Sequence, residues 1–340
     1  MGASEGGSSR RKWLLTGLAV VAVLVILLYG AASFFVYDQV GKAPQACWPN
    51  DAENTTASFP IPAPFPQDKV AEYQMPAAQD VTFPSRDPQI PDAELAGWWI
   101  PGADAQGPAV ILVHGVQSCR RESSVLLAAS MLHKAGFSVL LMDLRDHGDS
   151  EGDDARFAGG SEEYLDVLGA WDWVREQGVP DGKIGIAGFS FGSISSIVAG
   201  SQEPGVAAVF ADSSTTKMGE GIGLFLADQI KDGTGLSKIL VPGTIAWARL
   251  IANDDLTKYD PIDEVAAYAG RHIAFVHGAL DKVLPASMAQ QLHDTAAAAG
   301  AITPDAWIVP EAGHTQGIYY DPAGYEQRLV SFFTTALGAP

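Results

Sequence analysis

The chain has 340 residues and a formal net charge of −19, and 47% of its residues are apolar. This length accommodates one large α/β domain with an appendage or two small domains, and the composition is that of a globular protein. The acidic balance argues against nucleic-acid binding, because there is no basic stripe to pair with phosphates. Two cysteines are too few for a cysteine-rich metal site or a disulfide framework, so we expect no metal.

The first expected element is a transmembrane helix at residues 13–37, which contain fourteen Leu, Ile, Val and Phe and no charged residue. Such a stretch is long enough to cross a bilayer. The basic triplet at residues 10–12 predicts a cytoplasmic tail at residues 1–12 and places the rest of the chain outside the cell membrane. We favour an uncleaved anchor over the alternative, a signal peptide cleaved near residues 30–32.

A linker and a folded domain follow this helix. Six prolines in residues 38–67 predict an extended, semi-stiff linker that spaces the domain from the bilayer. The folded domain is expected at residues 68–340. Cys47 in the linker and Cys119 in the domain can form a disulfide outside the membrane, and two free thiols are the alternative.

Apolar runs in the domain predict eight strands that alternate with helices. The first two strands suggest a hairpin at a sheet edge, whereas residues 109–114 are continuously apolar, as in a strand covered on both faces. Alternation of this kind predicts a mostly parallel sheet wound on both faces. The expected strands are residues 80–83, 94–100, 109–114, 138–143, 183–187, 206–211, 272–277 and 306–309, and the main expected helices are 124–135, 164–174, 193–199, 285–299 and one that starts at 321–322.

Residues 213–259 interrupt this alternation, since they show helical apolar spacing and no clear strand. We interpret them as a helical cap over the sheet. Leu224 and Trp247 in the cap, together with Phe189, are candidates to line a substrate pocket. Packing in the core is the alternative role for most of the apolar residues in the cap.

The sequence Gly188-Phe189-Ser190-Phe191-Gly192 lies between a predicted strand and a predicted helix. Such a turn is too tight for side chains at the flanking positions, so glycines there leave the serine oxygen exposed at the sheet edge. A helix N-terminus behind the serine favours a developing oxyanion. Ser190 is therefore the candidate nucleophile.

A serine nucleophile needs a base and an acid that orients the base. His314 lies in a glycine-containing loop after the last predicted strand, whereas His272, His277 and His293 lie on or beside predicted strands and helices. For the acid we favour Asp281, which follows a strand at the sheet edge where such folds place their sites.

The turn at Ser190 is called the elbow below. Asp212, at the end of the strand after the elbow, competes with Asp281 for the role of orienting acid. Asp260 and Asp263 are weaker alternatives, because Asp260-Pro261 is typical of a helix start.

The oxyanion hole is expected to use the backbone N–H groups of Phe191 and Val116, with Gln117 as the fallback for the second donor. Val116 and Gln117 follow the strand at residues 109–114. His114 and His147 precede glycines in turns, and we expect them to make structural hydrogen bonds.

Taken together, these motifs resemble the α/β-hydrolase superfamily, in its serine esterase, thioesterase and aminopeptidase branches. The matching pieces are His114-Gly115, the 143–150 segment, the elbow at Ser190, the 278–285 segment and Gly313-His314, in the family's order. The resemblance implies an eight-stranded, mostly parallel sheet and no cofactor. Ser193 departs from prolyl-oligopeptidase relatives, which usually carry a glycine there.

The sequence thus predicts a membrane-anchored serine hydrolase that cleaves small or lipid-like carboxylic esters or thioesters through an acyl-enzyme on Ser190. A peptidase with the same triad is the alternative within enzymes. A tethered binding protein that keeps the fold without chemistry is the alternative outside them.

Overall fold

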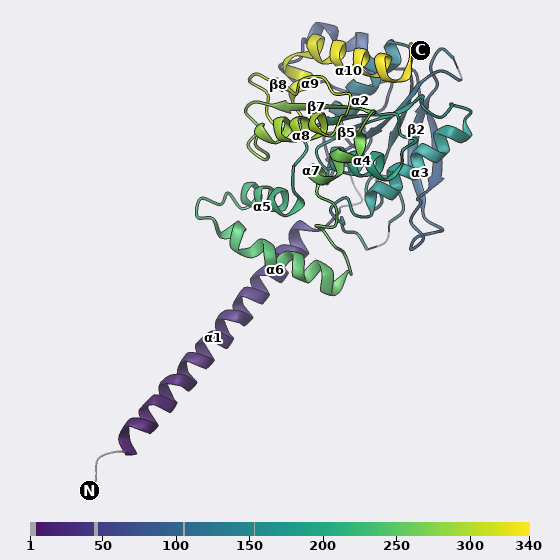
Figure 1. Ribbon diagram of the computed structural model, residues 1–340. Coiled ribbons are helices and arrows are strands. Elements are labelled where there is room, and N and C mark those ends of the chain that lie inside the picture. The colour runs from purple at the N-terminus through teal and green to yellow at the C-terminus, as the bar shows by residue number, and fades with distance from the viewer. Residues whose placement is uncertain (1–4, 44–46, 105, 153) are drawn as a thin grey trace.

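The computed structural model describes residues 5–43, 47–104, 106–152 and 154–340. An α/β domain lies at one end of a long N-terminal helix (Figure 1). In chain order the elements are α1 (Glu5–Val40), η1 (Gln67–Tyr73), β1 (Gln79–Pro84), β2 (Glu94–Ile100), β3 (Ala109–Val113), α2 (Ser123–Lys134), β4 (Ser138–Met142), α3 (Glu163–Glu176), β5 (Ile184–Phe189), α4 (Phe191–Gln202), β6 (Ala208–Asp212), α5 (Met218–Gln229), α6 (Leu236–Ile251), α7 (Pro261–Glu264), η2 (Val265–Tyr268), β7 (His272–Gly278), α8 (Ser287–Ala298), β8 (Trp307–Val309), α9 (Gly317–Tyr320) and α10 (Pro322–Leu337).

The eight strands form one sheet in the order β1-β2-β4-β3-β5-β6-β7-β8. β1 pairs antiparallel with β2, and β2 with β4, whereas every later pair is parallel. The predicted strands, the edge hairpin and the mostly parallel sheet are therefore confirmed. Because the carboxyl ends of the parallel strands meet at one edge, loops that are distant in sequence converge there.

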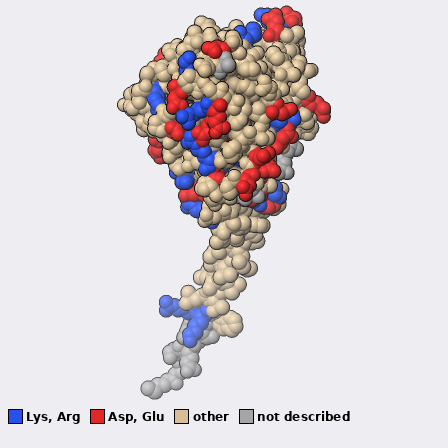
Figure 2. Space-filling view, turned by 90° about the vertical axis from the view of Figure 1, so that its right-hand side faces the viewer, with Lys and Arg blue, Asp and Glu red and all other residues tan. Residues whose placement is uncertain are grey.

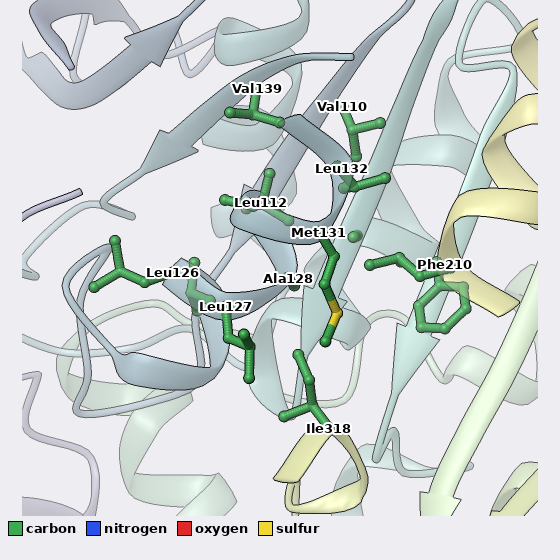
Figure 3. Close-up of a cluster of buried hydrophobic side chains, with 14 of the residues drawn as sticks. Val110, Leu112, Leu126, Leu127, Ala128, Met131, Leu132, Val139, Phe210 and Ile318 are labelled. Carbon is green, nitrogen blue, oxygen red and sulfur yellow. The ribbon is translucent and has the colours of Figure 1, made fainter. Parts of the chain in front are cut away.

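Two apolar layers cover the sheet, one on each face. In β3, Val110 and Leu112 point into a layer built with α2, α9 and α10, part of which Figure 3 shows. Ile111 and Val113 point into the opposite layer, built with α3, α4 and α8. All residues of β3 are fully buried, which explains why this strand is continuously apolar rather than alternating.

Helix α1 is long and apolar enough to cross a membrane, by its length and composition, over Arg11–Gln39. Figure 2 shows an uncharged stretch between basic residues near the N-terminus and the charged surface of the domain. The helix extends past the predicted span at both ends, because it begins at Glu5 and ends at Val40. Residues 1–4 of the predicted tail lie outside the described residues.

The predicted linker is not an extended spacer. Phe59, Ile61 and Phe65 are buried in the same apolar layer as α2. Cys47 forms a disulfide with Cys119, so the pairing weighed against free thiols is present. Proline-rich composition indicated an extended backbone, but apolar side chains between the prolines pack on the domain. Pro44 lies outside the described residues.

The segment 213–259 contains helices α5 and α6, as the cap interpretation predicted. The two helices share a small apolar cluster with the end of α1, which includes Val36, Tyr37 and Leu226. The hydroxyl of Tyr29 donates to the carbonyl oxygen of Ile239 at 3.0 Å. The cap therefore packs on the N-terminal helix as well as on the sheet domain.

Candidate active site

Ser190 lies in the turn between β5 and α4, with φ 52° and ψ −116°. A non-glycine residue in this region is strained, and such strain is common where a side chain must be presented. A Cβ at Gly188 would lie 2.3 Å from the carbonyl oxygen of Gly192, and one at Gly192 would lie 2.3 Å from that of Val113. Both flanking positions thus exclude every residue except glycine, as the motif predicted.

The structure brings Ser190, His314 and Asp281 together. The Oγ of Ser190 lies 2.7 Å from Nε2 of His314, and Nδ1 of the same ring lies 2.7 Å from Oδ2 of Asp281. With the proton on Nδ1, the ring donates to the carboxylate and accepts from the serine hydroxyl. This geometry suits transfer of the serine proton to the imidazole.

Asp281 is held rigidly and kept ionised. Its Oδ1 accepts from the backbone N–H groups of Val283 and Leu284, at 2.8 and 2.9 Å. Burial on its own raises the pKa of this carboxyl, but hydrogen bonds from His277 and His314 outweigh burial and hold the pKa well below its usual range. The group that orients His314 is therefore a carboxylate at neutral pH.

His277 is a second neighbour of Asp281, and its position on a predicted strand did not indicate this contact. Its Nε2 lies 2.9 Å from Oδ2 of Asp281 and 3.0 Å from the carbonyl oxygen of Leu284, and its side chain is fully buried. The signal available in the sequence was its position four residues before Asp281, on a turn that brings both side chains to the same side.

Asp212, the competing acid, has other partners. Its two carboxylate oxygens accept from the hydroxyls of Tyr325 and Ser213, at 2.7 and 2.8 Å. Ser213 in turn accepts from the backbone N–H of Thr315, at 3.1 Å. Burial raises the pKa of Asp212. Asp212 thus braces the loop that carries His314, without contacting the imidazole by a hydrogen bond among the described residues.

The weaker acid alternatives lie at the short helix α7, where Asp260 is the N-cap residue. Asp260 accepts from the backbone N–H of Met218 at 2.8 Å and caps the start of α5. Asp263 lies within the short helix α7.

The loop after β3 lies against the serine, since a Cβ at Gly115 would lie 3.4 Å from the Cβ of Ser190. The backbone N–H of Gln117 donates to Nε2 of His147 at 3.3 Å, which disfavours it as an oxyanion donor. The N–H groups of Val116 and Phe191 make no hydrogen bond with another described residue. They therefore remain the pair available to a substrate oxygen.

His114 and His147 hold this loop, as predicted. Nδ1 of His114 lies 2.7 Å from the carbonyl oxygen of Gly115, and its Nε2 accepts from the N–H of Leu144 at 3.1 Å. Burial lowers the pKa of His114 to about 3, and burial also lowers the pKa of His147. Both rings are neutral at physiological pH and serve structural hydrogen bonds.

An apolar cleft opens beside Ser190. Its lining from the cap is one face of α5, namely Met218, Ile222 and Phe225, and its floor includes Phe157 and Ile194. A more polar mouth adjoins it and includes Trp48, Glu122, Asp228 and His314.

The three predicted substrate residues have different locations. Phe189 borders the mouth but is almost fully buried. Neither Leu224 nor Trp247 lines the apolar cleft or its mouth. Trp247 instead donates to the carbonyl oxygen of Gly30 in α1 at 2.9 Å and packs edge-on against Phe34. The pocket assignment was wrong for Trp247, because its partner lies in a helix more than two hundred residues away.

No group of three or more His, Cys, Asp or Glu positioned to hold a metal ion occurs among the described residues.

Comparison with known proteins assigns the chain to a family. The sequence profile of the X-Pro dipeptidyl-peptidase (S15) family matches residues 78–268, more than half of the chain. The chain belongs to this family. Family membership makes the protein a serine hydrolase of the α/β-hydrolase fold, esterase- or peptidase-like. The match contains Ser190 but ends before Asp281 and His314.

Two individual proteins are also similar to this chain in sequence. An uncharacterised protein of Mycobacterium tuberculosis strain H37Rv is 25% identical over 302 residues, which cover 87% of this chain and 88% of the relative. A thiohydrolase of Aspergillus aculeatus is 34% identical over 88 residues, about a quarter of each chain.

The structure also resembles that of the Pyrococcus furiosus esterase Pf2001. The TM-score is 0.60 at 22% identity, covering 77% of this chain and 93% of the esterase. At this identity, the likeness establishes the fold.

Proposed function

We propose that the protein hydrolyses carboxylic esters or thioesters through an acyl-enzyme formed on Ser190. The observation that carries this proposal is the continuous hydrogen-bonded chain from Ser190 through His314 to Asp281. Ser190 attacks the carbonyl carbon, and His314 takes the serine proton and gives it to the leaving alcohol or thiol. Water then attacks the acyl-enzyme with His314 again as the base, which releases the carboxylic acid and restores Ser190. Asp281 stabilises the charged imidazole, and the N–H groups of Phe191 and Val116 bind the oxyanion.

The ester preference is supported by the cleft, whose lining beside Ser190 is largely apolar and suits an acyl chain. The named relatives include an esterase and a thiohydrolase. A peptidase with the same triad is the second candidate, and the family match favours it.

The test compares the full-length protein with its Ser190→Ala variant on p-nitrophenyl esters, acyl thioesters and aminoacyl p-nitroanilides. We expect the esters or thioesters to be cleaved, and the variant to lose a factor of roughly 10⁶ in turnover. A fluorophosphonate probe should label the wild type only. Cleavage of the anilides alone would favour the peptidase, and equal activity of the variant would contradict the mechanism.

The same proposal includes a location. α1 is expected to anchor the chain with its N-terminus in the cytoplasm and the catalytic domain outside. Arg11 and Lys12 before the apolar stretch support this orientation, and so does the disulfide between Cys47 and Cys119, since disulfides persist outside the cytoplasm.

Because both native cysteines are in the disulfide, a single introduced cysteine reports the orientation. A membrane-impermeant maleimide should label Thr335→Cys on intact cells. Ser9→Cys, the matched control at the other end of the chain, should be labelled only after permeabilisation. The opposite pattern would show that the domain faces the cytoplasm.

A further inference from the structure

Helix α6 carries an apolar stripe on its exposed side. Leu236, Ile239 and Leu250 are 46%, 61% and 74% exposed, and Pro242 and Ala246 between them are also exposed. Their spacing of three or four residues aligns all five on one face of the helix. We call these five residues the α6 stripe.

The opposite side of α6 faces the protein. Val241, Thr244 and Ala248 are buried, and at about 100° per residue they lie roughly opposite the centre of the α6 stripe. The contact with α1 lies at one edge of the α6 stripe, at about the angle of Leu236. There a Cβ at Gly243 would lie 2.2 Å from Oγ of Ser33, and Trp247 bonds to Gly30. The stripe therefore points away from the domain and borders the contact with α1.

This contact lies at a defined depth along α1. At about 1.5 Å per residue, Tyr29 is about 24 Å and Tyr37 about 36 Å from Trp13 along the helix axis. The hydrocarbon core of a bilayer is about 30 Å thick. Tyr29 and Tyr37 both contact the cap. If Trp13 marks the inner boundary, α6 meets α1 where the outer hydrocarbon boundary falls.

α6 lies across α1 rather than along it (Figure 1). A helix that crosses a spanning helix at the boundary lies along the membrane surface, where an apolar face contacts acyl chains. Lys238 and Arg249 are exposed at the edge of the α6 stripe. Arg249 pairs with Asp255 at 2.6 Å, whereas the ammonium group of Lys238 can reach lipid headgroups.

We propose that the α6 stripe is embedded in the outer leaflet, so that the enzyme takes its ester from the bilayer. This inference rests on the proposed function and its orientation. Helix α5 connects α6 with the apolar cleft beside Ser190. Its Ile222 lines the apolar cleft and belongs to the cluster that α5 shares with α6 and α1. The substrate class is an ester or thioester whose acyl chain partitions into lipid.

The first test measures depth without measuring catalysis. Full-length protein with an environment-sensitive NBD label on Ile239→Cys or Leu250→Cys is placed in phosphatidylcholine–phosphatidylglycerol vesicles that contain nitroxide-labelled lipid. Thr335→Cys, exposed on α10 at the far side of the domain, is the matched control. We expect blue-shifted emission and lipid quenching at the two α6 positions and neither at Thr335→Cys.

Water-exposed probes at all three positions would overturn the proposal. Probes on α6 that are shielded from water but not quenched by lipid would also overturn it, and would indicate that a second protein or a second copy covers the stripe.

The second test measures substrate supply with the Ile239→Glu/Leu250→Glu variant and Thr335→Glu as its control. Hydrolysis of dissolved p-nitrophenyl butyrate should stay unchanged in both, which also reports correct folding. Hydrolysis of p-nitrophenyl palmitate held in vesicles should fall only in the α6 variant. Equal rates on the palmitate would contradict supply from the bilayer. A wild type inactive on both esters would count against the proposed function, while the depth measurement would still decide the docking.

Discussion

The carboxyl edge of the sheet and the unit of cap and N-terminal helix are built in different ways. At the sheet edge, Ser190, Asp281 and His314 each follow a strand of the sheet within a few residues, so the backbone of the sheet sets their spacing. The unit of α1, α5 and α6 is held by one small apolar cluster and by bonds such as that from Tyr29 to Ile239. We therefore expect the proposed chemistry to depend on the core of the sheet, and access to the cleft to depend on a smaller unit that can be altered separately.

The substitution with the largest expected effect on turnover alters the catalytic residues at the sheet edge and leaves the cap unchanged. Asp281→Asn removes the carboxylate that orients His314, and turnover should fall by about 10⁴, as for the orienting acid of a serine protease triad. Asp212→Asn keeps a side chain that can bond to Tyr325 and should cost far less. Steady-state kinetics on one ester, with thermal unfolding to show that both variants are folded, decides between them. A larger loss in Asp212→Asn would reverse the assignment.

The sheet edge was predictable because local signals decide it. Continuous apolar runs identified β3, β5 and β6, and glycines at 188 and 192 identified the elbow. The glycine-containing loop after the last predicted strand selected His314, and the end of β7 selected Asp281. The contact between Asp281 and His277 was harder to predict, since a histidine at the end of a strand is usually structural. Only the turn after β7 brings Nε2 of His277 to the carboxylate.

A second prediction concerns the covalent tie between the two regions. The disulfide closes a loop of 72 residues in sequence separation, and the chain-entropy estimate for such a loop is roughly 4 kcal/mol. Cys47→Ser should lower the free energy of unfolding by about that amount. The measurement is denaturant unfolding in detergent, with Ser58→Ala on the same segment as control. An unchanged unfolding midpoint would show that packing of Phe59 and Phe65 alone secures the segment.

The third prediction concerns the loss of folding stability at low pH. Burial holds the pKa of His114 at about 3 in the folded chain against 6.5 for the ordinary side chain. The neutral ring therefore contributes its full stability above about pH 6.5, and that contribution is lost as pH falls from 6.5 towards 3. One such group gives a slope of at most about 1.4 kcal/mol per pH unit.

Unfolding of His114→Gln at several pH values should show a shallower slope than the wild type. Thr335→Ala, an exposed position on α10 with no titratable side chain, should keep the wild-type slope. Parallel curves for wild type and His114→Gln would assign the acid sensitivity to other groups.

The substitution with the smallest expected effect, on thermal stability, disturbs the contact between the cap and α1. The Cβ of Gly243→Ala would lie 2.6 Å from Cβ of Ser33, so the two helices must move apart, at a cost of about 1–3 kcal/mol. Gly233→Ala, where the added Cβ meets nothing within 4 Å, is the control. We expect a lower melting temperature in detergent for Gly243→Ala only, with hydrolysis of a short soluble ester retained. Loss of that activity would show that the cap shapes the catalytic edge.

The cap was less predictable than the sheet edge because long-range packing decides it. Helical spacing identified α5 and α6, but nothing in the local pattern showed that Trp247 would bond to Gly30. Similarly, the prolines around Phe59 and Ile61 indicated an extended spacer, whereas those two side chains are buried. Apolar periodicity shows that a residue is covered, and it does not show which distant element covers it.

The disulfide between Cys47 and Cys119 also sets a route for mechanical force. Tension on α1 reaches Cys47 after a short run of chain and can then cross directly to Cys119, in the loop between β3 and α2. The intervening strands β1, β2 and β3 lie in the closed loop and are bypassed. While the bond is intact, a pull on α1 is therefore carried through the disulfide to the loop after β3, and the edge hairpin of the sheet does not bear the load.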